Sequence, residues 1–243
     1  MAQDVRRPWA TVITAVVCAL VAAAALAMSA SLRDQGETRS SAGPTTVPST
    51  SGAGVDGCAV EPCTVLASMP VSGNLIDLVA DDGFTSGRLR IGGAGSSEVF
   101  EVTITEMGAV LGEDSLQCVP GAIVACLIRG TSEQGVIGQV VVGRTGKWNQ
   151  LTQPFQSDAG YLALADVAGD TGAEILVAQH RCDRESTPDC SATPVYLHVY
   201  NLRSQDKGCT RNYDDLEALP GWPVVAIRSA DLDPNRCVSA TGR

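Results

Sequence analysis

The feature that most constrains this chain is an uncharged apolar run near its amino terminus. The run covers residues 8–32 and follows the basic pair Arg6 and Arg7. A helix of about 20 apolar residues is long enough to cross the hydrocarbon core of a bilayer. Basic residues that flank a span stay on the cytoplasmic side. We therefore predict a cytoplasmic tip over residues 1–7, a transmembrane signal anchor over residues 8–32, and an extracytoplasmic remainder.

The same run has a second interpretation as a cleaved signal peptide. Ala25-Leu26-Ala27 has the small-x-small pattern of a cleavage site. The apolar run continues past this site, and no helix breaker precedes it, which favours an uncleaved anchor. Cleavage would instead release a secreted soluble protein, and the sequence leaves that alternative open.

Residues 33–57 have a composition unlike the rest of the chain. They are rich in Ser, Thr, Gly and Pro and hold almost no apolar side chains. Such a segment cannot bury a core of its own. If flexible, its root-mean-square reach is about 25–30 Å. We predict that it is a tether leading to an extracytoplasmic domain over residues 58–243.

Eight cysteines lie beyond the apolar run, and an even number in an exported segment indicates disulfides. Their spacing favours pairing between neighbours along the chain. The predicted pairs are Cys58–Cys63, Cys118–Cys126, Cys182–Cys190 and Cys209–Cys237. The sequence has no C-x-x-C pair of the kind used by structural zinc sites. A disulfide-stapled domain is therefore favoured over a zinc domain.

The charge of the outer part limits its partners. Of the 17 basic and 27 acidic residues, only Arg6, Arg7 and Asp4 precede residue 33, so 15 basic and 26 acidic residues lie beyond it, a net charge of −11. Nucleic acids and anionic lipid surfaces both require a positive surface. We therefore expect no nucleic-acid partner, and contact with a membrane only through the amino-terminal helix.

Beyond Cys58 the chain consists of short apolar runs separated by Gly, Asp and Ser. The runs are rich in β-branched residues, and several of them alternate polar and apolar positions, as residues 99–104 do. This pattern is typical of β-strands. Beyond residue 32, no stretch of the sequence has helical periodicity over ten or more residues. We predict an all-β domain following one transmembrane helix.

The strand pattern itself recurs along the chain. Strand-like starts fall at Leu75, Ile123, Ile175 and Val224, separated by 48, 52 and 49 residues. A period near 50 residues is typical of propeller blades, which occur in sets of about four to eight. We predict three to four blade-like units, arranged either as a propeller-like fold or as stacked meander sheets.

One segment has a family resemblance. Residues 162–178, LALADVAGDTGAEILVA, resemble the FG-GAP (VCBS, integrin-α-like) blade motif, in which an apolar strand leads into an Asp-rich loop and a second apolar strand. The chain as a whole resembles an uncharacterised family of actinobacterial membrane-anchored extracytoplasmic proteins. The latter resemblance implies no known activity.

The FG-GAP resemblance implies a calcium site, because the loop of that family often holds the ion through alternating oxygen ligands. Asp166, Asp170 and Glu174 match the first, third and last ligand positions. Ala168 stands where another Asp or Asn is expected, and Thr171 replaces the usual Gly. The alternative is that Asp166 and Asp170 only cap a tight turn through the backbone. No other cofactor is indicated.

The sequence contains no recognisable catalytic motif, neither a nucleophile elbow nor a general acid/base pair. His198 alternates within a strand-like run, and Trp222 is expected to pack in the core. We predict a binding or scaffold module of the cell envelope, with an envelope protein or a glycan as partner. The alternative, an envelope hydrolase, requires Asp166, Asp170 and Asp231 to meet in one cleft.

Overall fold

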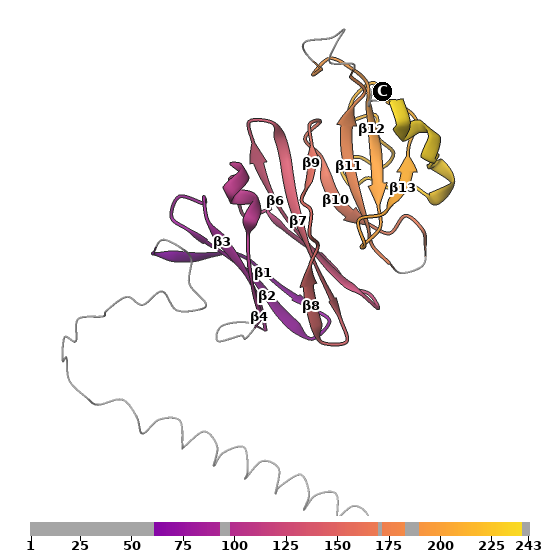
Figure 1. Cartoon of the computed structure of the whole chain (residues 1–243). Coiled ribbons are helices and arrows are strands. Elements are labelled where there is room, and N and C mark those ends of the chain that lie inside the picture. The colour runs from indigo at the N-terminus through magenta and orange to yellow at the C-terminus, as the bar shows by residue number, and fades with distance from the viewer. Residues whose placement is uncertain (1–60, 93–97, 170–171, 183–189, 240–243) are drawn as a thin grey trace, which may run out of the picture. The chain divides into compact units, whose positions relative to one another are not determined.

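The computed structural model describes residues 61–92, 98–169, 172–182 and 190–239, all within the compact unit Ser51–Arg243. The predicted tip (1–7), membrane anchor (8–32) and tether (33–57) lie outside these residues. Within the described part, no helix is long and apolar enough to span a bilayer. This part is all-β, as predicted, and contains three separate antiparallel sheets (Figure 1).

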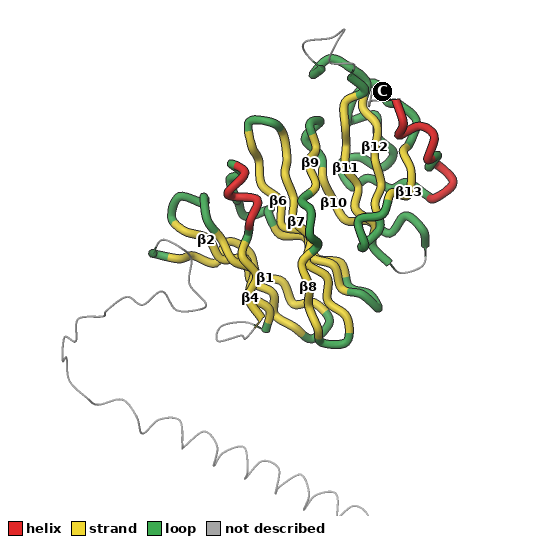
Figure 2. The backbone as a smooth tube through the Cα atoms, viewed as in Figure 1, coloured by secondary structure: helices red, strands yellow, loops and turns green. Residues whose placement is uncertain are grey.

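Each sheet is an up-and-down meander of strands in chain order. Sheet 1 contains β1 (Cys63–Val71), β2 (Asn74–Asp81), β3 (Gly87–Ile91) and β4 (Glu98–Glu101). Sheet 2 contains β5 (Leu116–Val119), β6 (Val124–Ser132), β7 (Gly135–Arg144) and β8 (Lys147–Gln150), with β9 (Phe155–Ser157) also paired to β7. Sheet 3 contains β10 (Leu162–Ala165), β11 (Glu174–His180), β12 (Val195–Tyr200) and β13 (Asp206–Cys209). Figure 2 shows the short 3₁₀ helices η1 (Thr103–Met107), η2 (Ser229–Asp231) and η3 (Pro234–Ser239) in red.

The predicted repeat corresponds to the second strand of each meander. Strands β2, β6 and β11 begin at Asn74, Val124 and Glu174, so successive starts are 50 residues apart. The expected fourth start at Val224 is wrong, because this residue lies in a bend outside any strand and is 80% exposed. The segment after β13 instead forms turns and short 3₁₀ helices that pack against sheet 3.

Two hairpins show why the strands turn where they do. Ser72 and Gly73 both have positive φ and join β1 to β2, and Thr145 and Gly146 do the same between β7 and β8. A two-residue loop with positive φ at both positions matches the twist of antiparallel strands. The Thr145–Gly146 pair, which superficially resembles part of a phosphate-binding loop, is therefore a hairpin turn.

Side-chain alternation sorts the core into three layers. In β6, Cys126 and Ile128 face the core shared with sheet 1, whereas Ala125 and Leu127 face the core shared with sheet 3. In β11, Ile175 and Val177 join that second core, and the alternate residues face the carboxyl-terminal segment. Both faces of β6 and β11 are thus buried, which explains their nearly continuous apolar sequences.

Three of the predicted cysteine pairs are present as disulfides: Cys118–Cys126, Cys182–Cys190 and Cys209–Cys237. The first links directly opposed residues of β5 and β6. The third ties the end of β13 to η3. Cys63 is disulfide-bonded as well, and its predicted partner Cys58 lies outside the described residues.

A buried amide side chain joins sheets 1 and 2. Gln139 of β7 is only 2% exposed. Its Oε1 accepts hydrogen bonds from the backbone N–H and the hydroxyl of Thr103, at 2.8 and 2.9 Å. Its Nε2 donates to the carbonyl of Glu101 at 2.8 Å. The side chain therefore satisfies backbone groups at the end of sheet 1 that no strand pairs.

We expect Gln139→Ala to destabilise the domain by about 2–4 kcal/mol, because it leaves buried backbone groups without partners. Urea unfolding measures the loss. Gln134→Ala is the matched control, since Gln134 is an exposed residue of the β6–β7 turn, and should change the free energy of unfolding by about 0.5 kcal/mol or less. Equal effects of the two variants would contradict the bridging role of Gln139.

Asp81, at the end of β2, organises the turn that leads to β3. Its carboxylate accepts hydrogen bonds from the backbone N–H of Thr85 at 2.9 Å and the hydroxyl of Ser86 at 2.8 Å. Burial by itself raises the pKa of Asp81, but these hydrogen bonds outweigh it and hold the pKa below its ordinary value of 3.8. The ionised form is thus the one that stabilises the fold.

This lowered pKa predicts acid sensitivity with a defined sign. The stabilisation from Asp81 is fully present above the unfolded-state pKa of about 3.9 and is lost as the pH falls through the lower folded-state pKa. We expect Asp81→Asn to destabilise the domain at pH 7 and to reduce its further loss of stability on acidification. Denaturation midpoints from pH 7 down to pH 2 test this, with the exposed neighbour Asp82 changed to Asn as control. Parallel pH profiles for both variants would refute it.

Candidate functional site

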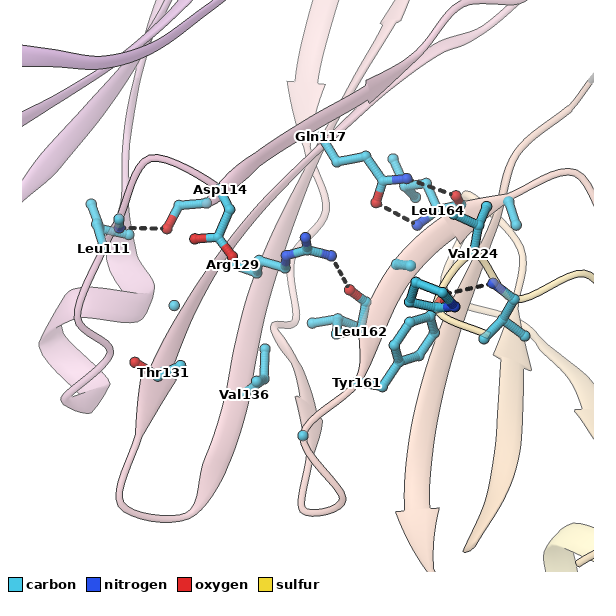
Figure 3. Close-up of a pocket in the computed structure, with 18 of the residues that line it drawn as sticks. Leu111, Asp114, Gln117, Arg129, Thr131, Val136, Tyr161, Leu162, Leu164 and Val224 are labelled. Atoms are coloured by element: carbon cyan, nitrogen blue, oxygen red, sulfur yellow. Dashed lines mark hydrogen bonds between the residues drawn. The ribbon is translucent and has the colours of Figure 1, made fainter. Parts of the chain in front are cut away.

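A cleft of about 520 Å³ lies between sheets 2 and 3 (Figure 3). One wall comes from the loop that precedes β5 and from β5 and β6, and the other from β10 and the turn around Trp222. The described residues that line it are Val110, Leu111, Gly112, Asp114, Ser115, Gln117, Arg129, Gly130, Thr131, Val136, Gly160, Tyr161, Leu162, Ala163, Leu164, Ala165, Trp222, Pro223, Val224 and Val225. The lining thus includes both charged and aromatic side chains.

The cleft exists because two sheet edges face each other without pairing. β5 and β10 are edge strands of their sheets. Gln117 of β5 bonds to the backbone of Leu164 in β10 with both ends of its amide, accepting from N–H and donating to C=O at 3.0 Å each. Side-chain bonds of this kind satisfy an edge that could otherwise recruit another strand. They also hold the two walls at a fixed separation.

Arg129 of β6 supplies the positive charge of the cleft. Its Nη1 donates to the carbonyl of Leu162 at 2.7 Å, which is the only hydrogen bond of its guanidinium among the described residues. A guanidinium has five N–H donors. Asp114 also lines the cleft, yet no carboxylate in the described part of the chain forms an ion pair with Arg129. Most of the donors of Arg129 are therefore available to a ligand.

An aromatic pair forms the opposite wall. The rings of Tyr161 and Trp222 lie 5.5 Å apart between centroids and are tilted by 51°. The Tyr161 hydroxyl accepts a weak 3.4 Å hydrogen bond from the Val225 N–H. Burial raises the pKa of Tyr161, opposed by that hydrogen bond and by the charge of Arg129. The hydroxyl is thus neutral at physiological pH and can donate, while Val224 stands exposed at the rim.

The cleft has the chemistry of a binding site. It combines a cation, an amide, a phenol and an aromatic surface, the usual mixture by which a pocket binds and orients a ligand. Asp114 is the single acidic residue among the described lining residues, and none of those residues is His or Cys.

The candidate calcium loop lies between β10 and β11. Asp166 Oδ1 accepts the N–H of Gly169 at 2.6 Å, and Glu174 Oε2 accepts the N–H of Val167 at 2.9 Å. Glu174 is buried at 6% exposure. Asp170 lies outside the described residues. Both described carboxylates therefore close the loop through the backbone, and a calcium ion there stays a prediction.

The turn and calcium interpretations predict different results. If Asp166 only caps the turn, Asp166→Asn retains the accepting oxygen and leaves the melting temperature close to that of the wild type. Asp166→Ala then lowers the free energy of unfolding by about 0.5–2 kcal/mol, and the melting temperature falls with it. Millimolar calcium then shifts neither variant nor the wild type. A calcium-dependent rise in melting temperature that Asp166→Asn abolishes would establish the ion instead.

The envelope-hydrolase alternative stays a prediction, because Asp170, one of the three carboxylates that it requires, lies outside the described residues. Asp231 Oδ2 accepts the N–H of Arg228 and closes its own 3₁₀ turn. Asp166 and Asp231 are both absent from the cleft lining, and Asp170 lies outside the described residues. Among the described residues, the only compact group of three potential metal ligands is His198, Cys209 and Cys237.

His198 occupies a strand position, as predicted, but has polar neighbours that the sequence did not reveal. One ring nitrogen, Nδ1, lies 2.9 Å from the Tyr200 hydroxyl, and the two rings stack with centroids 4.2 Å apart. The other, Nε2, lies 3.1 Å from Asp206 Oδ2. Burial, then the charge of Asp206 and the neighbouring Tyr196, raise the pKa of Tyr200 to about 12, so its hydroxyl stays protonated.

Sequence reasoning missed the main cleft residues. Arg129 and Gln117 have no motif around them, and their cross-sheet partners lie 33 and 47 residues away. Trp222 packs, as expected, against a core, the one between sheet 3 and the carboxyl-terminal segment, but it also lines the cleft. A signal was present in Arg129, a charged residue directly following the apolar run of β6.

Comparison of the chain with protein-family models, curated proteins and solved structures finds no significant match. The FG-GAP and actinobacterial resemblances therefore stay predictions, and function has to be argued from the cleft itself.

Proposed function

We propose that this chain is an extracytoplasmic binding module of the cell envelope, held at the membrane by its amino-terminal apolar run. The disulfides Cys118–Cys126, Cys182–Cys190 and Cys209–Cys237 support an oxidising compartment, because disulfides are rare in the cytosol. The acidic outer domain and its tether fit a soluble head beyond the bilayer. Release of the same head by cleavage after Ala27 is the alternative.

We propose further that the three sheets are blades of an open, propeller-like arrangement. Three observations support this. Each sheet is a meander, second strands recur every 50 residues, and the first strands β1, β5 and β10 contact one another in sequence. The carboxyl-terminal segment covers the far face of sheet 3, as a capping element does at the end of a repeat array. Ligand sites between neighbouring blades fit the general use of rigid β frames to present loops.

The ligand that the cleft fits best is an acidic saccharide. Arg129 carries unpaired donors suited to a carboxylate, and the Tyr161–Trp222 pair offers a surface on which the apolar face of a sugar ring can rest. Ser115 and the Tyr161 hydroxyl provide hydrogen-bonding groups of the kind that sugars require. The observation that carries the proposal is Arg129: a guanidinium that pairs with no carboxylate of the described residues and lies in a cleft beside two aromatic rings.

Titration calorimetry of the full chain tests this proposal with three probes: a uronic-acid oligosaccharide, its uncharged counterpart, and an acidic peptide. We expect the acidic saccharide to bind, and Arg129→Gln to weaken binding by about tenfold or more, the loss expected for one charge-assisted hydrogen bond. Arg144→Gln, on the exposed end of β7, is the matched control and should leave the affinity unchanged.

Two further outcomes decide between ligand classes. Binding of the acidic peptide alone would assign the cleft to a protein partner rather than to a glycan. Binding that is the same in Arg129→Gln as in the wild type would show that the ligand does not occupy the cleft.

A further inference from the structure

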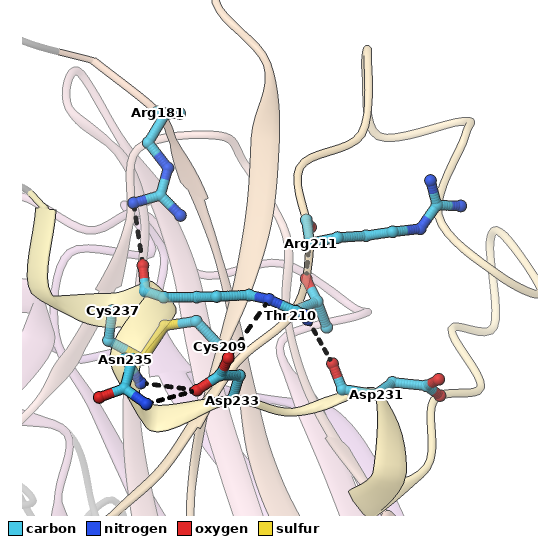
Figure 4. A network of polar contacts seen from close by, with 9 residues as sticks. Arg181, Cys209, Thr210, Arg211, Asp231, Asp233, Asn235 and Cys237 are labelled. Carbon is cyan, nitrogen blue, oxygen red and sulfur yellow. Dashed lines mark hydrogen bonds and ion pairs between the residues drawn. A yellow bond between two sulfur atoms is a disulfide. The ribbon is translucent and has the colours of Figure 1, made fainter.

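A second chemical centre lies on the third sheet, away from the cleft. His198 on β12 and Cys209 on β13 are directly opposed residues of the ladder. Cys237 of η3 is bonded to Cys209, as Figure 4 shows in yellow. One ring nitrogen of His198 and the two sulfur atoms lie within 4.8 Å of one another. Asp206 joins this group, with Oδ2 3.1 Å from His198 Nε2 and Oδ1 3.9 Å from Cys237 Sγ.

The imidazole of His198 lies beside this group, but its Nε2 forms no hydrogen bond with any member of the group. Within the described part of the chain, Nε2 is buried and makes no hydrogen bond, although Asp206 Oδ2 lies at ion-pair distance. The distance of 3.1 Å is short enough for a hydrogen bond, but the N–H of Nε2 does not point at the Asp206 oxygen as a hydrogen bond requires. Nε2 is therefore a buried nitrogen without a hydrogen-bond partner in the described part. Buried polar atoms without partners are rare and call for an explanation.

We propose that Cys209, Cys237, His198 and Asp206 form a thiol-dependent zinc site, which becomes available when the Cys209–Cys237 disulfide is reduced. Thiolate sulfur, imidazole nitrogen and carboxylate oxygen are the ligand atoms that bind Zn²⁺ in proteins, and four of them complete a tetrahedral site. The four residues come from β12, β13 and η3, with ten residues between His198 and Cys209, and so give no recognisable motif. The inference is independent of the cleft and of its ligand.

The chemistry balances with a dithiol as reductant. The dithiol gives two electrons and two protons to the disulfide and is itself oxidised to a cyclic disulfide, leaving Cys209 and Cys237 as thiols. Zn²⁺ then binds the two thiolates and releases their two protons to solvent. Cys237 is the sulfur open to attack by the dithiol, since Cys209 is fully buried.

The surrounding backbone keeps the ligands together after reduction. Cys209 and Asp233 exchange two backbone hydrogen bonds, at 3.2 and 3.0 Å. The Asp233 carboxylate accepts the N–H of Asn235 at 2.9 Å at the start of η3 (Figure 4). These bonds do not involve sulfur, so Cys237 stays beside Cys209 when the disulfide opens. The same segment is therefore crosslinked by a disulfide under oxidising conditions and by a metal under reducing ones.

The second ring nitrogen of His198 has the partner that a ligating histidine needs. Metal-bound imidazoles usually donate their other N–H to a nearby oxygen, which fixes the ring. In His198 that nitrogen is Nδ1, 2.9 Å from the Tyr200 hydroxyl. The Asp206 carboxylate is held in turn by the N–H of Gly208 at 2.7 Å.

The test uses the full chain with Co²⁺ as a spectroscopic substitute for Zn²⁺. After reduction with a phosphine, we expect one equivalent of Co²⁺ to give the thiolate charge-transfer absorption and the visible bands of a tetrahedral site, and the unreduced chain to give neither. Cys209→Ser with Cys237→Ser should abolish the signal, and His198→Ala should weaken Co²⁺ binding by about tenfold or more. Cys182→Ser with Cys190→Ser, which removes another disulfide, should leave it intact.

A second readout keeps the proposal falsifiable if a variant folds poorly. When the wild-type chain is reduced in the presence of Zn²⁺, Cys209 and Cys237 should be protected from alkylation, whereas Cys182 and Cys190 should react. Equal alkylation of all four cysteines, or a cobalt signal that survives loss of Cys209 and Cys237, would overturn the site.

Discussion

The structure depends on amide side chains that bond across sheets where strands do not. Gln139 connects sheet 2 to the end of sheet 1, and Gln117 connects it to β10 of sheet 3. Apolar burial makes the sheets stack but does not fix their edges, because the hydrophobic effect has no direction. A buried amide with both ends bonded does fix them, since breaking it exposes unpaired polar groups at a cost of about 1–3 kcal/mol each. Gln139 and Gln117 thus fix how the edges of neighbouring sheets are placed, and the cleft lies between two of these edges.

The cleft follows from this geometry. Gln117 and Arg129 bond to outward-facing backbone groups of β10, so that strand neither pairs with β5 nor offers a free edge. On the other side of β10, strands β7 and β10 can approach closely because residue 138 of β7 is a glycine. A Cβ atom at Gly138 would collide with the side chain of Leu162. The sheets therefore touch in the core and separate at their edges. The space between the edges is where Arg129 meets the aromatic pair Tyr161 and Trp222.

Much of the fold could be predicted from the sequence because its signals are local. Alternating apolar residues and two-residue turns specify strands and hairpins within a few positions, and three of the four predicted pairs of neighbouring cysteines are disulfides in the described part. Val224 shows the limit. Its apolar neighbours Val225 and Ile227 are buried, which imitates a strand, yet they pack as an irregular cap on sheet 3. Periodicity reports burial on alternate sides, and an extended loop can satisfy it as well as a strand can.

The candidate sites could not be predicted, because they are assembled from distant segments. Arg129 finds Leu162 across 33 residues, and His198 meets Cys237 only through the fold. The loop proposed for calcium, by contrast, can be recognised in the sequence, since its residues are nearly contiguous. The described carboxylates Asp166 and Glu174 both bond to backbone there. Local sequence patterns thus predicted turns, whereas the side chains with polar atoms left free for a ligand, Arg129 and His198, are positioned by long-range contacts.

Amide hydrogen exchange at Leu164 tests the central claim, that side-chain bridges hold the sheets and form the cleft. In the wild type the Leu164 N–H donates to Gln117 Oε1 and should exchange slowly. In Gln117→Ala it should lose protection, while the N–H of Ala178, which bonds to the Tyr161 carbonyl within sheet 3, stays protected. Unchanged protection of Leu164 in that variant would contradict the account.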